Sequence, residues 1–183
     1  YFFHIFFVFL SHEMRTPLNS ILLLSRLMAD NTEDNLNEDQ IESAKVIQSS
    51  GTSLLELIDE ILDLAKIESG KMTLENEMVQ IEKVVQDVKN LFLPLISEKG
   101  LKFNINISEK TTLQLETDRM RLDQVLRNLI SNAIKFTSQG KIDFNISTHP
   151  EKKNFIIFSV KDSGIGIPKD KQAVIFEAFQ QAD

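Results

Sequence analysis

The spacing of apolar residues changes near residue 70, and this change sets the possible folds. Before it, apolar residues recur at alternating intervals of three and four, which is the pattern of a helix in a bundle. The members of this stripe are Ala44, Ile47, Gly51, Leu54, Ile58, Ile61 and Ala65. After it, short apolar or alternating runs are separated by turn residues, as in strands. The sequence therefore predicts a helical part followed by an α/β part.

The first 70 residues predict a helical hairpin. An earlier apolar stripe contains Met14, Leu18, Ile21 and Met28, and the polar segment 30–40 supplies the connection and the next N-cap. The later stripe is widened beyond a two-stranded seam by further leucines, Leu55, Leu57, Leu62 and Leu64. Two helices bury too little apolar surface alone, so we expect the hairpin to dimerise into a four-helix bundle.

The remaining residues predict a two-layer α/β sandwich, because helical patterns interleave with strand patterns. The strand patterns lie at 72–80, 101–108, 112–118, 141–149 and 154–162. The helical patterns run from Ile81 to Ile96 and from Arg119 to Phe136. With the boundary at 68–71, the expected parts are an apolar extension at 1–10, a helical domain at 11–70 and an α/β domain at 71–183.

Composition excludes several classes of function. Acidic residues number 27 against 20 basic ones, and a net charge of −7 argues against a nucleic-acid-binding face. The absence of cysteine excludes disulfides, thiolate zinc sites and cysteine nucleophiles, and it fits a cytoplasmic location. The apolar run at 1–10 is too short to cross a bilayer. We therefore expect membrane attachment only through segments outside this chain.

His12 stands in the segment SHEMRTPLNS, beside a proline that disturbs its helix. His12 is two residues from Met14 on the apolar stripe, so we expect the imidazole to face solvent. Pro17 cannot donate to the carbonyl of Glu13, which predicts a bend one turn after the histidine. Glu13 is placed to hold one ring nitrogen and raise the basicity of the other. A surface histidine without function is the alternative that these residues leave open.

A polar stripe marks the helix predicted from Arg119 to Phe136, for which Asp118 is a good N-cap. Its expected apolar face consists of Leu122, Val125, Leu126, Leu129, Ile130, Ala133 and Ile134. The opposite side carries Arg121, Asn128, Asn132 and Lys135. Asparagine is unfavourable in mid-helix, whereas its amide can ligate Mg²⁺ and donate to phosphate. A solvated polar face is the alternative.

A glycine loop follows the last strand pattern, in the segment DSGIGIP. Gly164 and Gly166 allow the backbone to approach a ligand closely, and the carboxylate of Asp162 can accept from the exocyclic amine of a base. The loop matches neither a dinucleotide-binding fold nor a Walker sequence. Phe176 and Phe179 follow at helical spacing, and core packing is the safer interpretation of that pair.

Four segments in this order, SHEMRTPLNS, NLISNAIKFT, DSGIGIP and FEAFQQAD, resemble the sensor histidine kinases of two-component phosphorelays. They are similar to the phosphoacceptor box, the N box, the first glycine box and the F box. The resemblance covers nearly the whole chain from Ser11. It implies a dimerisation and phosphotransfer domain at 11–70, followed by an ATP-binding domain of the histidine-kinase and Hsp90-like type at 71–183.

The resemblance implies roles for residues in the first domain. His12 would be the phosphoacceptor, and Glu13 would be its acid/base partner. Thr16 matches the position that helps to place water when a regulator is dephosphorylated. The implied partners are a second copy of the chain and the receiver domain of a response regulator.

The resemblance also implies ATP and Mg²⁺ as cofactors of the second domain. Asn132 matches the Mg²⁺ ligand, Asn128 the polar residue one turn earlier, and Lys135 a phosphate contact. An amide at 128 cannot act as the water-activating base that a glutamate provides in the related ATPases of the gyrase group.

The remaining positions of the resemblance concern the base of the nucleotide and the loop that covers it. Phe136 would pack near the adenine, and Asp162 would bind its amino group. Gly164 and Gly166 would shape the pocket wall and the hinge of the lid.

The sequence departs from the family pattern at its C-terminal end. The second glycine box, GxGLGL, closes the lid over the phosphates and is not present, so we expect an α/β domain that is truncated at its C-terminus. Two functions follow from the sequence. The first is ATP-dependent autophosphorylation of a histidine with transfer to a response-regulator aspartate. The alternative is a dimeric phosphotransfer scaffold without its own kinase activity.

Overall fold

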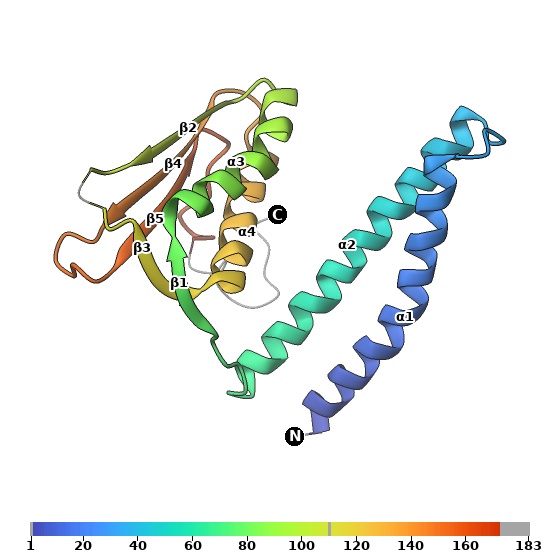
Figure 1. Ribbon diagram of the computed structural model, residues 1–183, viewed down its shortest axis with the longest axis horizontal. Helices are drawn as coiled ribbons and strands as arrows, with labels where there is room; N and C mark the ends of the chain where they lie inside the picture. The colour runs from blue at the N-terminus through green and yellow to red at the C-terminus, as the bar shows by residue number, and fades with distance from the viewer. Residues whose placement is uncertain (1, 110, 173–183) are drawn as a thin grey trace. The chain divides into compact units, whose positions relative to one another are not determined.

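The computed structural model describes residues 2–109 and 111–172, and the side-chain surroundings from Glu13 onward (Figure 1). The chain divides into two compact units, Tyr1–Thr73 and Leu74–Asp183, here called the hairpin unit and the sandwich unit. The segment FEAFQQAD, with Phe176 and Phe179, lies outside the described residues. Within the described residues, no helix combines the length and the apolarity that a bilayer crossing requires.

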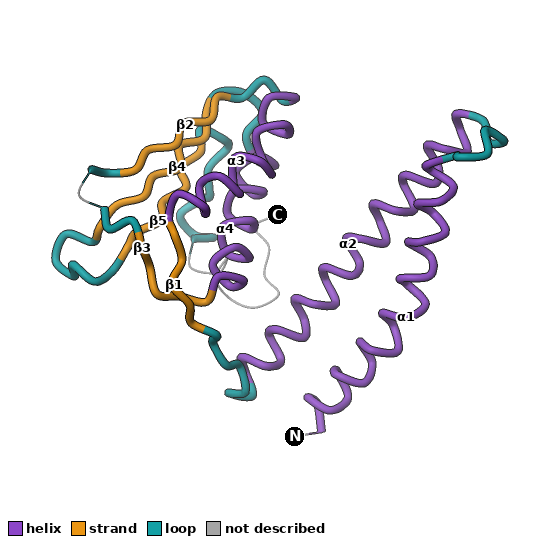
Figure 2. The backbone as a smooth tube through the Cα atoms, in the orientation of Figure 1, coloured by secondary structure: helices purple, strands orange, loops and turns teal. Residues whose placement is uncertain are grey.

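The hairpin unit consists of α1 (Phe2–Asp30) and α2 (Glu38–Glu68), joined by the short loop in Figure 2. Pro17 lies inside α1, and the helix continues through it. The start of α2 is fixed by a capping box, in which the side chain of Asn37 accepts from the backbone N–H of Gln40 at 2.9 Å. The side chain of Gln40 accepts in turn from the N–H of Asn37 at 2.9 Å. The helical hairpin predicted from the sequence is confirmed.

Only part of each apolar stripe is buried within the hairpin. The buried positions recur every seven residues, at Leu18 and Ser25 in α1 and at Ala44, Gly51 and Ile58 in α2. The other series is 36–48% exposed and also recurs every seven residues, at Met14, Ile21, Met28, Ile47, Leu54 and Ile61. Within one copy of the chain these six residues therefore do not face a core. One neighbouring helix covers only half of so broad a stripe.

Between Leu74 and residue 172, apart from residue 110, the sandwich unit holds two helices and two small sheets. Its elements are β1 (Asn76–Gln80), α3 (Ile81–Glu98), β2 (Lys102–Ile107), β3 (Gln114–Asp118), α4 (Arg119–Phe136), β4 (Lys141–Thr148) and β5 (Ile156–Asp162). Strands β1 and β3 form one antiparallel pair. The other sheet has the order β2-β4-β5, with β2 parallel and β5 antiparallel to β4. All five predicted strands and both predicted helices are confirmed, with their ends within a few residues of the expected ones.

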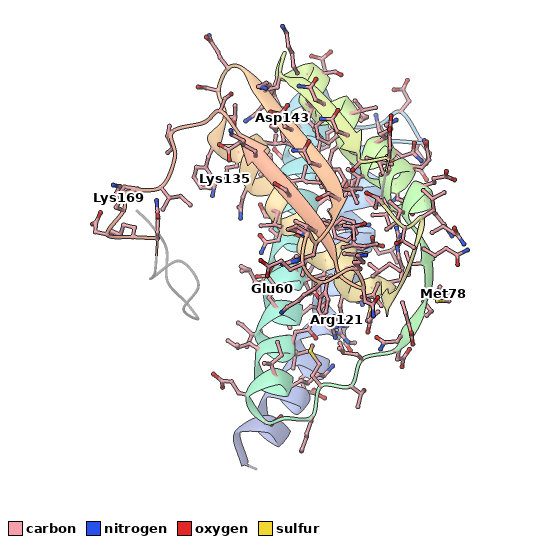
Figure 3. The ribbon with its side chains drawn as sticks, turned by 90° about the vertical axis from the view of Figure 1, so that its left-hand side faces the viewer. Glu60, Met78, Arg121, Lys135, Asp143 and Lys169 are labelled. Atoms are coloured by element: carbon pink, nitrogen blue, oxygen red, sulfur yellow. The ribbon has the colours of Figure 1, made fainter. Side chains whose placement is uncertain are left out.

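Helices α3 and α4 cover one side of the strands (Figure 1), and the core lies between the two layers. Alternate residues of β4 point into it, and Ile142, Phe144 and Ile146 are at most 1% exposed. The opposite face of the sheet is polar, and Asn104 donates to Asp143 across it at 2.7 Å. Asp143 is labelled in Figure 3. The ammonium of Lys141, and then the amide of Asn104, lower the pKa of this carboxyl from its ordinary value.

The predicted apolar face of α4 requires one correction. Leu126, Ile130 and Ala133 are buried, but Val125 is 56% exposed and Leu129 is 44% exposed. Two layers bury one stripe of a helix, and both exposed residues lie at the edge of that stripe, beside the polar one. The apolar side of α4 is thus narrower than its sequence indicates.

Candidate functional site

The start of α4 is held by Asp118, as the sequence predicts. One carboxylate oxygen accepts from the backbone N–H of Arg121 at 3.0 Å, and the other accepts from the N–H of Glu75 at 3.0 Å. These bonds, in that order, lower the pKa of Asp118 from its ordinary value, because they favour the ionised carboxylate. Asp118 itself is buried, so it ties the entry into β1 to the first turn of α4. The helix therefore presents a fixed face along its length.

The polar face of α4 carries two asparagines one turn apart. The side-chain NH₂ of Asn132 donates to the amide oxygen of Asn128 at 3.1 Å, and both residues are exposed. One turn further, the ammonium of Lys135 lies 5.0 Å from the centre of the Phe136 ring, which is 42% exposed. Figure 3 labels Arg121 and Lys135 at opposite ends of the same helix. The face thus offers neutral amides and a cation to a ligand.

The glycine loop after β5 lies against the last turn of α4. The N–H of Ile165 donates to the carbonyl of Phe136 at 3.4 Å. Gly164 approaches so closely that an added Cβ would collide with that carbonyl. The N–H of Gly164 also donates to the carboxylate of Asp162 at 2.8 Å. Glycine at 164 is therefore required by space, because the loop could not approach the helix with a side chain there.

The second glycine of the loop is required by backbone conformation. Gly166 has a φ of +70°, which residues other than glycine rarely adopt, and nothing lies within 4 Å of an added Cβ. The neighbouring Ile165 is 82% exposed. Glycine at 166 is thus favoured by the backbone conformation and not by a lack of space.

Ser163, between Asp162 and the first glycine, makes three bonds that the sequence did not single out. Its N–H donates to the carbonyl of Lys141 at 3.1 Å, and its hydroxyl accepts from the N–H of Lys141 at 2.9 Å. The same hydroxyl donates to the carbonyl of Gln139 at 3.4 Å. A hydroxyl residue immediately after a strand was the only signal for these contacts in the sequence.

The residues that the sequence nominated for the sandwich unit lie on α4 and at the end of β5. Those on α4 are Asn128, Asn132, Lys135 and Phe136, and the others are Asp162 at the end of β5 with Gly164 and Gly166 in the loop after it. The contact between the loop and Phe136 joins the two sets.

The candidates of the hairpin unit lie together on α1. Glu13 and Thr16 are both exposed there, one turn apart. His12 precedes them in the same helix, and its side chain lies outside the described part of the structure. His149 occupies the turn between β4 and β5, where its Nδ1 accepts from the N–H groups of Glu151 and Lys152 at 3.2 and 3.1 Å. These bonds make His149 part of the loop structure.

The residues on α4 fit a nucleotide with a divalent cation. In residues 2–109 and 111–172, no cluster of three or more histidine, aspartate or glutamate side chains is placed to hold a metal ion. A cation here would instead be held by an amide oxygen together with oxygens of the nucleotide. A hard cation such as Mg²⁺ needs few ligands from the protein when water and phosphate supply the others. Amides do not repel phosphate, whereas carboxylates would.

Two family models match the chain. The His Kinase A (phospho-acceptor) domain matches residues 6–70. The histidine kinase-, DNA gyrase B- and HSP90-like ATPase matches residues 117–183. The first match covers most of the hairpin unit, and the second begins at the end of β3 and includes α4 and the glycine loop.

Curated relatives that are longer proteins match nearly the whole chain. The autoinducer 2 sensor kinase/phosphatase LuxQ of Vibrio vulnificus is 38% identical over 177 residues, which are 95% of this chain and 20% of the relative. The aerobic respiration control sensor protein ArcB of Escherichia coli is 40% identical over 172 residues, which are 94% of this chain and 22% of the relative. The chain thus spans about a fifth of the length of these relatives.

Solved structures have the same arrangement of elements. Full-length ShkA, in complex with AMPPNP, matches 97% of this chain and 37% of its own with a TM-score of 0.80 at 35% identity. Histidine kinase ThkA, in complex with the response regulator protein TrrA, matches 95% of this chain and 49% of its own with a TM-score of 0.61 at 26% identity. The chain therefore belongs to the sensor histidine kinases of two-component systems.

Proposed function

We propose that this chain transfers the γ-phosphoryl group of ATP to His12 and then to an aspartate of a response-regulator receiver domain. The observation that carries the proposal is the contact between the glycine loop and the end of α4. In this proposal Asp162 and the α4 residues Asn128, Asn132 and Lys135 would contact the same nucleotide. Base recognition and phosphate recognition would thereby meet on one surface.

The sandwich unit would bind ATP through separate contacts to its base and its phosphates. Asp162 would accept from the amino group of the adenine, and the exposed ring of Phe136 would pack against it. Lys135 and the side-chain amide of Asn128 would contact the phosphates. The oxygen of Asn132 would ligate Mg²⁺, which neutralises phosphate charge. The binding of the ATP analogue AMPPNP by ShkA supports this assignment.

The reaction at His12 would be an in-line transfer. A ring nitrogen forms the bond to the γ-phosphorus while the bond from that phosphorus to the β–γ bridging oxygen breaks, and ADP leaves. Glu13, the next residue in α1, would hold the other ring nitrogen and take up its proton. Asn128 has no basic group to activate water, which favours phosphorylation of the histidine over hydrolysis of ATP. Thr16 would place water when the regulator is dephosphorylated.

The hairpin unit would carry out the transfer as a dimer. One series of its exposed apolar residues recurs every seven positions on both helices, which is the spacing of a surface that packs against another pair of helices. A second copy of the chain would cover this surface and form a four-helix bundle. The complex of ThkA with the response regulator TrrA supports a receiver domain as the second partner.

Incubation with γ-labelled ATP and Mg²⁺ tests the proposal. We expect acid-labile, base-stable label on the wild-type chain, none on His12→Gln, and a loss of at least about 100-fold with Asn132→Ala, since the latter removes a ligand of the Mg²⁺ that neutralises phosphate charge. His149→Gln is the matched control, because it changes a histidine of the β4–β5 turn.

The scaffold alternative gives a different result in a second incubation. A scaffold would remain unlabelled with ATP but would accept label at His12 from a phosphorylated receiver domain. Label that persists in His12→Gln would contradict both functions.

A further inference from the structure

The last rung of the β4–β5 ladder is closed by a side chain instead of the backbone. In an antiparallel ladder, alternate pairs exchange two N–H···O=C bonds, and the rung at Lys141 and Ser163 continues the series of Asn145–Ser159 and Asp143–Lys161. The N–H of Ser163 makes its expected bond to the carbonyl of Lys141 at 3.1 Å. The return bond from the N–H of Lys141 goes to the hydroxyl of Ser163 at 2.9 Å.

Because the hydroxyl replaces the carbonyl of Ser163 as acceptor, that carbonyl makes no bond to Lys141 in the sheet. The backbone can then leave β5 at the next residue, Gly164, and turn toward the carbonyl of Phe136. Without the hydroxyl, the N–H of Lys141 would pair with water or with the Ser163 carbonyl, and the bond to the carbonyl would extend the strand where the loop now turns. The hydroxyl therefore stabilises the end of the strand at Asp162.

Gly140 makes room for this arrangement. It has a φ of +114°, and an added Cβ would collide with the hydroxyl of Ser163. The hydroxyl also donates to the carbonyl of Gln139 at 3.4 Å, so the turn before β4 holds it from two sides. Ser163 and Gly140 thus form one joint, here called the Ser163 joint, between the turn at 139–141 and the glycine loop.

We infer that Ser163 is a positioning residue for adenine recognition by Asp162. Asp162 is held by its own bond from the N–H of Gly164 and by the Ser163 joint on the following residue. The inference rests on the proposed function, because it assumes that Asp162 accepts from the adenine amino group. Ser163 itself contacts no part of the nucleotide in this assignment; it sets the direction of the neighbouring carboxylate.

Amide hydrogen exchange in the nucleotide-free chain tests the joint without any assumption about function. Ser163→Ala should raise the exchange rates of the Lys141 and Gly164 amides by roughly fivefold or more, which is the effect expected from one lost hydrogen bond. Ser163→Thr, which keeps a hydroxyl, should restore slow exchange. Ser159→Ala is the matched control, as it removes an exposed hydroxyl from the same strand. Unchanged exchange in Ser163→Ala would overturn the inference.

Nucleotide selectivity tests the positioning role. Ser163→Ala should weaken binding of ATP by roughly five- to tenfold and leave the weak binding of GTP within about twofold, since GTP has no amino group at that ring position. A merely structural lesion would lower both affinities or the active fraction equally, and that outcome would overturn the role. If the wild-type chain prefers ATP to GTP no more than Asp162→Ala does, the proposed contact between Asp162 and the adenine is wrong. The hydrogen-exchange rates would still test the Ser163 joint, because they do not depend on nucleotide binding.

Discussion

The two units of this chain differ in how much of their apolar surface they bury within one copy. The sandwich unit closes a core between its helices and strands, in which Ile81, Ile130 and Phe144 have no exposed surface. The hairpin unit buries one series of positions and leaves an equivalent series exposed, with Leu54 at 42%. The difference shows that the sandwich is built around contacts within one chain, whereas the hairpin presents half of its stripe outward.

Exposed apolar residues occur in the sandwich unit too, but their spacing differs. On α4, Val125, Leu129 and Phe136 lie beside the asparagine stripe, and a seven-residue interval joins only Leu129 and Phe136, whereas the hairpin series has six members on two helices. Their place next to Asn128 and Asn132 fits the rim of a ligand site. The hairpin series instead fits a partner with the same helical repeat. The length of the series and the residues beside it thus distinguish the two surfaces.

Charges on the exposed hairpin series should abolish assembly and leave the sandwich unchanged. In the double substitution Ile47→Glu and Leu54→Glu, a dimer would have to bury four unpaired carboxylates, each at a cost of several kcal/mol. We expect a monomer by light scattering, with an unchanged thermal transition of the sandwich unit. Ser49→Glu is the control, because Ser49 lies about 200° around α2 from Ile47. A dimer that persists in the double variant would contradict the assignment of this surface.

Substitution of Gly164 by alanine should have the next largest effect. The added Cβ would collide with the carbonyl of Phe136 and would lie 2.9 Å from a carboxylate oxygen of Asp162. The loop must then move away from α4, so we expect ATP affinity to fall by at least about tenfold. Titration calorimetry would measure this loss. Affinity within twofold of the wild type would show that the loop does not need its contact with the helix.

Acid titration should reveal the cap that starts α4. The pKa of Asp118 is lowered from 3.8 in the folded chain, so its stabilising contribution is present above about pH 4 and is lost as pH falls through the lower folded value. Asp118→Asn should therefore reduce the melting temperature of the sandwich at pH 7, and the difference from wild type should narrow toward pH 3. A difference that is constant across this range would mean that the ionised form is not what the cap uses.

Substitution of Gly51 by alanine in the hairpin unit should have the smallest effect. An added Cβ at Gly51 would lie 2.8 Å from a terminal methyl of Leu22, which can move, rather than from backbone. The gain of about 1 kcal/mol from replacing glycine in a helix should offset that movement, so we expect unfolding free energy to change by less than about 1 kcal/mol. Denaturant titration would measure it. A loss above about 2 kcal/mol would show that the two helices tolerate no displacement there.

Residue patterns predicted most of the fold because they reflect local physics. The alternation of Ile142, Phe144 and Ile146 defined β4, and Asp118 identified the start of α4. Periodicity did not reveal which half of the hairpin stripe packs inside the chain, because it reports a face and not the partner that covers it. The exposure of Val125 and Leu129 was missed for the same reason.

The candidate site was predictable only where residue type alone carries the chemistry. The asparagines at 128 and 132 stood out because they are unfavourable in mid-helix and can serve as ligands. The role of Ser163 depends on its rung in the ladder and on the space left by Gly140, which are set by tertiary contacts. No local sequence pattern contains that information.

The seven-residue series on the hairpin surface ties the folding of one unit to the amount of protein present. A surface that is covered only by a second copy contributes stability by mass action, so the hairpin would gain stability as the chain becomes more concentrated. The sandwich, whose core is complete within one chain, would melt at the same temperature at every concentration. A single polypeptide would then hold one unit whose stability varies with its abundance and one whose stability does not.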